Sequence, residues 1–187
     1  MESKSILVFG AHPDDLEIGM GGTIAKLSAM GYEVQPIIAT LPNFVKSDNK
    51  KGRKTESMLS AKVMGCKSPV FLDLTPDEMV FGRKIVTLID SLVTKYKPDS
   101  IFTQWYGDSH QDHQILTKSV ISACRDQNNI FMYETTIPGG ITENSFRPQL
   151  YVNITETIET KKNALECFES QSIRCGEIWI PAILGRC

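Results

Sequence analysis

The chain has 187 residues, 41% of them hydrophobic and 22% charged, which is the composition of one globular domain with its own hydrophobic core. Its formal net charge of −2 and its pI near 5.9 argue against nucleic acid as a partner. No apolar run approaches the roughly 20 residues that span a bilayer, and the first strand begins too early to leave room for a signal peptide.

Cysteine usage indicates a reducing compartment. The five cysteines are widely and irregularly spaced with no C-x-x-C pair, so they match neither a zinc ribbon nor a disulfide framework. Cys66, Cys124 and Cys167 fall in or beside apolar helical patterns and are expected to be buried thiols. A cytoplasmic location is therefore expected.

The first predicted element is a short apolar strand over residues 6–9, and a polar motif follows it directly. The motif reads Ala-His-Pro-Asp-Asp-Leu-Glu over residues 11–17 and runs on into Gly21 and Gly22. Beyond these glycines, apolar residues at helical spacing predict a helix that ends at Gly31. The motif is therefore expected where a strand meets a helix, at the carboxyl edge of a parallel sheet, where open α/β proteins bind ligands.

Each polar residue of this motif also has a purely structural interpretation. Asp14 or Asp15 alone could cap the helix, and His12 alone could be a hydrogen-bonded histidine at the end of a strand. A single cap does not need two carboxylates, a histidine and closely spaced glycines. Two adjacent carboxylates repel each other, and a bound cation would compensate their charge. The combination therefore favours a functional site.

Strands and helices alternate through the middle of the chain. Further strands are predicted over residues 34–40, 69–74, 101–103 and 129–132, and further helices over residues 55–64, 85–93 and 115–121. This alternation implies βαβ units and a mostly parallel sheet. We therefore expect a single domain over residues 1–187 with an α/β, Rossmann-like fold, in which helices cover both faces of the sheet in three αβα layers.

The remaining segments are less regular. Loops are predicted over residues 41–54 and 135–148, and a further strand over residues 150–153. Thr155 begins a helix with a capping pattern that continues through Phe168. The mixed pattern of the last residues, from Ser172 onward, supports no assignment.

A second polar cluster follows the strand at residues 101–103 and leads into a helix. It contains Asp108, His110, Asp112 and His113, so two of the three histidines of the protein lie here and the third is in the first motif. The predicted topology places both strand ends on one edge of the sheet. All three histidines are therefore expected to meet at that edge.

Such a constellation has a known chemical use. Two histidines and one carboxylate around an open position are the ligands of hydrolytic zinc sites and also of non-haem iron sites. Zinc is favoured for a hydrolase, and another divalent metal such as Fe²⁺ would fit the same ligands. One carboxylate of the Asp14–Asp15 pair would bind the metal while the other acts as a base. The spare histidine of His110 and His113 would serve as general acid or oxyanion partner, oriented by Asp112.

These motifs resemble those of the LmbE/PIG-L-type zinc-dependent deacetylases, whose signature is A-H-P-D-D-x-E, then Gly-Gly, and a distal H-x-D-H. Residues 11–17, the glycine pair and residues 110–113 match this signature. Arg53 with Glu56 and the Tyr133–Glu134 pair also fit, so the resemblance runs from Ile6 to about Gln171.

The resemblance implies a role for seven residues. It assigns metal binding to His12, Asp15 and His113, catalysis to Asp14, His110 and Asp112, and substrate contact to Arg53. In that scheme Asp14 is the general base, and His110 is the charged partner of the oxyanion or the general acid. Family members remove N-acetyl groups, typically from compounds that contain N-acetylglucosamine. An N-acetylated amino sugar is therefore the expected substrate, and a homo-oligomer is compatible with the sequence.

Two other interpretations compete with this one. A binding protein of the same fold could keep the metal and lack activity, because family members usually continue past residue 185 with a helical segment that flanks the site. Here the sequence ends at Cys187, so either this member is short or its C-terminal segment is missing. A nucleotide-binding loop at Gly19, Gly21 and Gly22 is disfavoured, since the spacing is not G-x-G-x-x-G and the nearby aspartates would repel a phosphate.

Overall fold

Five parallel strands form the centre of the structure. The computed structural model describes residues 4–41, 49–135 and 146–187, and within them the strands lie in the order β3-β2-β1-β4-β5. The strands are β1 (Ser5–Gly10), β2 (Glu33–Thr40), β3 (Val70–Leu74), β4 (Ser100–Gln104) and β5 (Ile130–Tyr133). Every pairing is parallel, which confirms the predicted α/β, Rossmann-like sheet. The strand order reverses between β1 and β4, the place where doubly wound sheets bind ligands.

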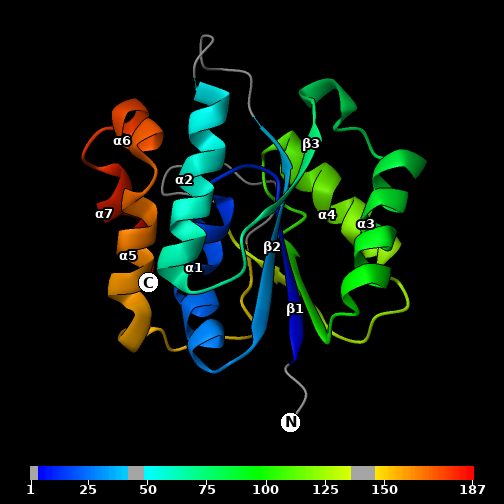
Figure 1. The fold of residues 1–187 in the computed structure, drawn as a ribbon, viewed down its shortest axis with the longest axis horizontal. Helices are drawn as coiled ribbons and strands as arrows, with labels where there is room; N and C mark the ends of the chain where they lie inside the picture. Colours follow the sequence, from blue (N-terminus) through cyan, green and yellow to red (C-terminus); the bar gives the residue numbers. More distant parts are fainter. Residues whose placement is uncertain (1–3, 42–48, 136–145) are drawn as a thin grey trace.

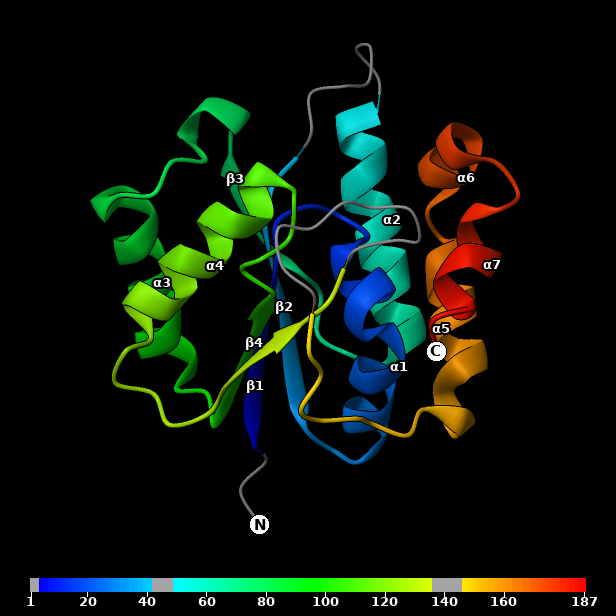
Figure 2. The same cartoon turned by 180° about the vertical axis from the view of Figure 1, so that it is seen from behind.

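Helices cover both faces of this sheet and give the three predicted layers (Figures 1 and 2). One face carries α1 (Asp15–Ala29), α2 (Asn49–Met64), α5 (Ile158–Glu166), α6 (Glu169–Cys175) and α7 (Trp179–Leu184). The other face carries α3 (Arg83–Tyr96) and α4 (Gln111–Ala123). Two 3₁₀ turns, η1 (Pro76–Glu78) and η2 (Thr155–Thr157), precede α3 and α5. Within the described residues, no helix has both the length and the apolar character needed to cross a membrane.

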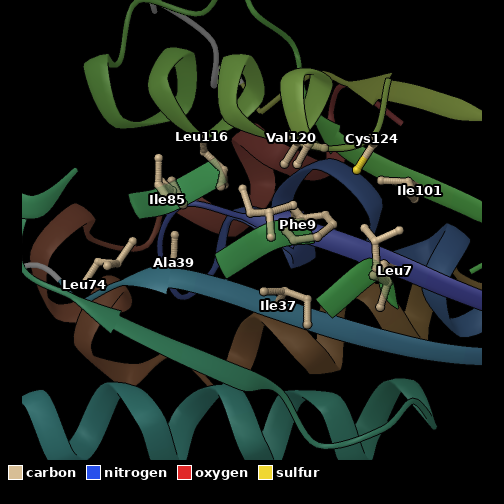
Figure 3. Close-up of a cluster of buried hydrophobic side chains, with 14 of the residues drawn as sticks. Leu7, Phe9, Ile37, Ala39, Leu74, Ile85, Ile101, Leu116, Val120 and Cys124 are labelled. Carbon is tan, nitrogen blue, oxygen red and sulfur yellow. The ribbon is translucent and has the colours of Figure 1, made fainter. Parts of the chain in front are cut away.

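Strand β1 is buried on both faces, which fixes its position at the centre of the molecule. Leu7 and Phe9 belong to the apolar cluster beneath α3 and α4 (Figure 3). Ile6 and Val8, which alternate with them, belong to the cluster beneath α1. Close packing on both faces, with Leu7, Val8 and Phe9 fully buried, restricts the movement of the carboxyl end of β1. The polar motif that follows β1 is therefore held on a rigid support.

Helix α1 begins earlier than predicted, at Asp15, so the glycines lie inside the helix and not before it. They permit close packing. A Cβ atom on Gly19 would lie 2.3 Å from the ring of Tyr133, and one on Gly22 would lie 2.7 Å from the side chain of Ile154. Glycine therefore costs helix propensity here but lets α1 approach its neighbours. Helices α2 and α4 also begin before their predicted starts, at Asn49 and Gln111.

The strand predicted over residues 150–153 is wrong. This segment has no regular structure, and Leu150 and Tyr151 are 62% and 80% exposed. Their apolar side chains are exposed to solvent, so an apolar pattern alone was misleading. The single helix predicted through Phe168 is also divided, since α5 ends at Glu166 and α6 begins three residues later.

The other segments agree in part with their predictions. Helix α2 begins at Asn49, so the last residues of the loop predicted over residues 41–54 are helical. Residues 42–48 and 136–145, which belong to the two predicted loops, lie outside the described part of the chain. The unassigned tail forms the end of α6 and all of α7. All five cysteines are free, and of the three expected to be buried only Cys124 is fully so.

Candidate metal centre and active site

The three histidines converge at the carboxyl ends of β1 and β4. Nitrogen atoms of His12, His110 and His113 all lie within 4.8 Å of one another, and the ring centroids of His12 and His110 are 4.7 Å apart. The side chain of Gln104 joins the two loops, because its Oε1 accepts a hydrogen bond of 2.9 Å from the amide of Ala11. This convergence confirms the prediction that all three histidines meet at one edge of the sheet.

Asp15 lies between two of these histidines. Its Oδ1 is 3.4 Å from Nε2 of His113, and its Oδ2 is 3.5 Å from Nδ1 of His12. The same Oδ2 accepts a hydrogen bond of 2.7 Å from the backbone amide of His12. This carboxylate is buried, so two imidazole rings and a carboxylate face one another in a site largely closed to water.

Asp112 contacts different atoms from those expected. Its carboxylate Oδ2 lies 2.8 Å from Nε2 of His12, so it orients His12 and not the spare histidine. His110 is the N-cap of α4, and its Nδ1 accepts a hydrogen bond of 3.2 Å from the backbone amide of Asp112. Burial and the nearby rings of His113 and His12 lower the pKa of His110 below its ordinary value. Both observations favour a neutral ring over the charged partner that the family resemblance implied.

Asp14 is held in an unusual conformation beside Arg53. Its φ of 94° is in the left-handed region, which costs energy for a residue with a Cβ atom. Arg53 donates from Nη2 to Asp14 Oδ1 at 3.1 Å and to the carbonyl oxygen of Pro13, and from Nη1 to Ser170 Oγ at 3.1 Å. Ser170 in turn donates to the carboxylate of Glu56 at 2.7 Å. The predicted substrate contact, Arg53, is therefore buried and engaged with protein oxygens.

Burial and close charges shift the pKa values of the site. Burial raises the pKa of Asp14 to about 7, although Arg53 opposes the shift. Burial alone would raise the pKa of Asp15, but His113 and His12 outweigh it and hold this pKa well below its usual range. Burial alone would lower the pKa values of both histidines, yet carboxylate partners raise that of His12 to about 9 and that of His113 to about 10. Asp15 and the two histidines therefore stabilise one another's charged forms.

Two further side chains contact the site, and neither was assigned a role from the sequence. Asp108 is buried against His113, with 2.9 Å between its Oδ2 and the ring Nδ1, and Thr135 donates to the same oxygen. The position of Asp108 at the head of the second polar cluster was a usable signal. No local pattern marked Thr135, which lies 22 residues away from His113 in the chain.

This donor set suits a metal ion. Imidazole nitrogens and carboxylate oxygens are ligands that Zn²⁺ and Fe²⁺ accept, and the nitrogens, all within 4.8 Å of one another, could share one ion after small shifts. The histidine group includes His110, whereas the predicted ligands are His12, Asp15 and His113; the two sets share two members. The fold and the site together define a doubly wound α/β protein with a candidate metal centre at the switch point of its sheet.

Comparison with known proteins gives the family. Residues 7–124 match the model of the PIG-L family, described as GlcNAc-PI de-N-acetylase. The chain is 31% identical over 167 residues to YaiS of Escherichia coli K12, an uncharacterized deacetylase, with 86% of this chain and 88% of that protein covered. The chain therefore belongs to the PIG-L family and is an amide hydrolase of the deacetylase type.

Two further proteins are similar over most of their length. Diacetylchitobiose deacetylase of Thermococcus kodakarensis is 26% identical, with 95% of this chain and 74% of that protein covered. The structure of the conserved protein TT1542 of Thermus thermophilus superposes with a TM-score of 0.82 and 19% identity, over 95% of this chain and 84% of that chain. The structural likeness confirms the fold.

Proposed function

We propose that the protein is a zinc-dependent hydrolase that removes an N-acetyl group from an amino sugar of the N-acetylglucosamine type. One observation carries the proposal: two buried carboxylates, Asp14 and Asp15, lie beside the converging histidines, so one can bind a metal while the other moves a proton. Residues 1–187 would form a single domain of this kind. The similarity to a diacetylchitobiose deacetylase supports the class of substrate.

His12, Asp15 and His113 are the proposed metal ligands. Asp15 lies within 3.5 Å of a ring nitrogen of each of the two histidines, so the three side chains can share one ion with small adjustments. Zinc at this position would polarise the substrate carbonyl and lower the pKa of a water molecule to about 7. Fe²⁺ would fit the same donors.

Asp14 is the proposed general base. Arg53 holds its Oδ1, which fixes the plane of the carboxylate and leaves the other oxygen to accept a proton from the attacking water. In the later step of the same hydrolysis, the protonated carboxyl group can give that proton to the leaving nitrogen. Arg53 would then position the base, and a contact with substrate would be a second role that rests on the family resemblance.

His110 is the proposed partner of the oxyanion. Because its Nδ1 accepts from the amide of Asp112, the ring hydrogen lies on Nε2, where it can be donated to a developing negative charge. Asp112 contributes in two ways: its backbone amide donates to Nδ1 of His110, and its carboxylate orients His12. A neutral donor thus replaces the charged one that the sequence suggested.

An inactive binding protein of the same fold is the alternative. To test the proposal, the protein is stripped of metal, reconstituted with Zn²⁺, and assayed for acetate release from N-acetylglucosamine and diacetylchitobiose. We expect release from at least one N-acetylated sugar by the reconstituted protein alone. Tight zinc binding with no release from any N-acetylated sugar would favour the binding protein. A cytoplasmic location, which rests on the five free cysteines, stays part of the proposal.

A further inference from the structure

Asp108 is a buried carboxylate, 5% exposed, in the loop between β4 and α4. Both of its oxygens are engaged. Oδ1 accepts a hydrogen bond of 2.9 Å from the backbone amide of His110, and Oδ2 lies 2.9 Å from Nδ1 of His113. One side chain therefore contacts two histidines of the candidate metal centre, the first through its backbone and the second through its ring.

The contact with His113 fixes which ring nitrogen carries the hydrogen. An ionised carboxylate only accepts hydrogen bonds, so Nδ1 of His113 must donate to Asp108. Nε2 is then the nitrogen with the free electron pair in the neutral ring. That atom is directed toward Asp15, whose Oδ1 is 3.4 Å away. The tautomer that Asp108 selects is the one that points a metal-binding nitrogen into the site.

Thr135 contacts the same oxygen of Asp108 as His113 does. It follows β5 and is 6% exposed, and its hydroxyl donates to Oδ2 of Asp108 at 2.9 Å. The same hydroxyl oxygen lies 3.3 Å from Nδ1 of His113. The hydroxyl therefore contacts both partners. Through it, the residues that follow β5, the edge strand beside β4, help to hold the ring of His113 in place.

We propose that Asp108 and Thr135 are positioning residues for the metal centre. Asp108, held by Thr135, sets the orientation and tautomer of His113 so that Nε2 faces the metal. The inference rests on the proposed function to the extent that His113 must be a metal ligand. Carboxylates that orient ligating histidines in this way typically change metal affinity by about 10- to 100-fold when they are removed.

The test measures Zn²⁺ affinity of the metal-stripped protein by competition with a chromophoric chelator. Asp108→Asn should weaken binding by about 10- to 100-fold, and Thr135→Val should weaken it less. Because Thr135 acts through Asp108, adding Thr135→Val to Asp108→Asn should cause little further loss. Asp99→Asn is the matched control: Asp99 accepts from the amide of Ser5 at 2.9 Å, before β4 begins and away from the site, and its loss should leave zinc affinity unchanged.

Two comparisons separate the inference from the proposed function. If His113→Ala weakens zinc binding while Asp108→Asn and Thr135→Val do not, the positioning role is wrong and the ligand assignment stands. If His113→Ala binds zinc as the wild type does, the ligand assignment fails and the inference fails with it. Should Asp108→Asn not fold, ¹⁵N NMR of the zinc-loaded wild type decides, because a His113 ring protonated on Nε2 would overturn the inference.

Discussion

Substitution of Asp14 separates metal binding from catalysis most clearly. Replacing it by asparagine keeps the size of the side chain and leaves the three proposed ligands untouched. We expect Asp14→Asn to retain zinc and to lose about 10²-fold or more in kcat, because the amide cannot accept a proton as the carboxylate does. Zinc content and steady-state acetate release measure the two effects. A variant with near-normal kcat would remove Asp14 from the role of base.

His110 distinguishes the two possible ligand sets. If Asp15 completes the site, His110→Ala should leave zinc affinity nearly unchanged while kcat falls by roughly 10²- to 10³-fold, as when an oxyanion donor is removed. Asp15→Ala is the matched comparison and should lose the metal. Chelator competition on both variants gives the answer. The reverse pattern, with zinc lost in His110→Ala and kept in Asp15→Ala, would make the three histidines the ligands.

For the individual residues of the site, the sequence predicted which side chains meet but not which of their atoms form hydrogen bonds. The strand-end positions of His12 and of the second cluster were enough to bring the histidines together. Pairing depends on side-chain rotamers and on which atoms already have partners. The carboxylate of Asp112 therefore orients the ring of His12, while its backbone amide donates to the ring of His110. Thr135 could not have been found at all without the sheet that brings β5 beside β4.

The glycines of α1 allow a test of how this helix supports the site. A methyl group on Gly19 would meet the buried ring of Tyr133 and lie 2.8 Å from the carbonyl oxygen of Glu134. Tyr133 cannot withdraw easily, because its hydroxyl donates to the carbonyl oxygen of Phe9 at 2.6 Å. We expect Gly19→Ala to lower the free energy of unfolding by about 1–3 kcal/mol, as overpacked cores do. Urea denaturation measures the loss.

Gly21 in the same helix is the matched control. A methyl group there would lie 3.1 Å from Cγ of Lys161, a less severe contact than the 2.3 Å contact at Gly19. Alanine also has the better helix propensity, so Gly21→Ala should remain within about 1 kcal/mol of the wild type or gain stability. Equal stability of Gly19→Ala and the wild type would show that α1 can move away from β5.

Elements with a strong pattern were predicted well, and those set by tertiary contacts were not. The amphipathic spacing around Ile85 and Ile89 located α3, whereas the glycines of α1 hid the start of a helix. Pro36 lies inside β2 and is paired with Val8 of β1, although proline is rare within strands. It lies one residue before β2 begins to pair with β3, at Ile37, so its missing amide hydrogen removes no bond of that ladder.

The intact core can be tested through Cys124, which packs beneath α4 and is 1% exposed. Burial raises its pKa from 9.0 to about 11. The folded state therefore holds this proton more tightly than the unfolded state, a contribution to stability that is present below pH 9 and lost as the pH rises toward 11. At pH 9, iodoacetamide should label the exposed Cys175 and Cys187 rapidly and Cys124 only as the whole domain unfolds. Mass spectrometry of timed samples measures both rates, and equal rates would contradict a closed core.

For the whole molecule, the alternation of strands and helices predicted the fold class, because parallel strands must be connected across the faces of a sheet. The order of the strands was not predicted, since it depends on which faces pack best once the chain has collapsed. The family followed from two short motifs that lie about 100 residues apart and meet at the switch point. The motifs imply the class of substrate, an N-acetylated amino sugar, but they do not identify which member of that class is bound.

The central claim is that one metal ion at His12, Asp15 and His113 supports removal of an N-acetyl group. Its most direct test adds Zn²⁺ stepwise to the metal-stripped protein and follows acetate release from diacetylchitobiose and N-acetylglucosamine. We predict that release rises in proportion to zinc and reaches its plateau at about one equivalent per chain, while His113→Ala stays inactive at the same zinc concentrations. Acetate release that is independent of added metal, or equal in His113→Ala, would contradict the account.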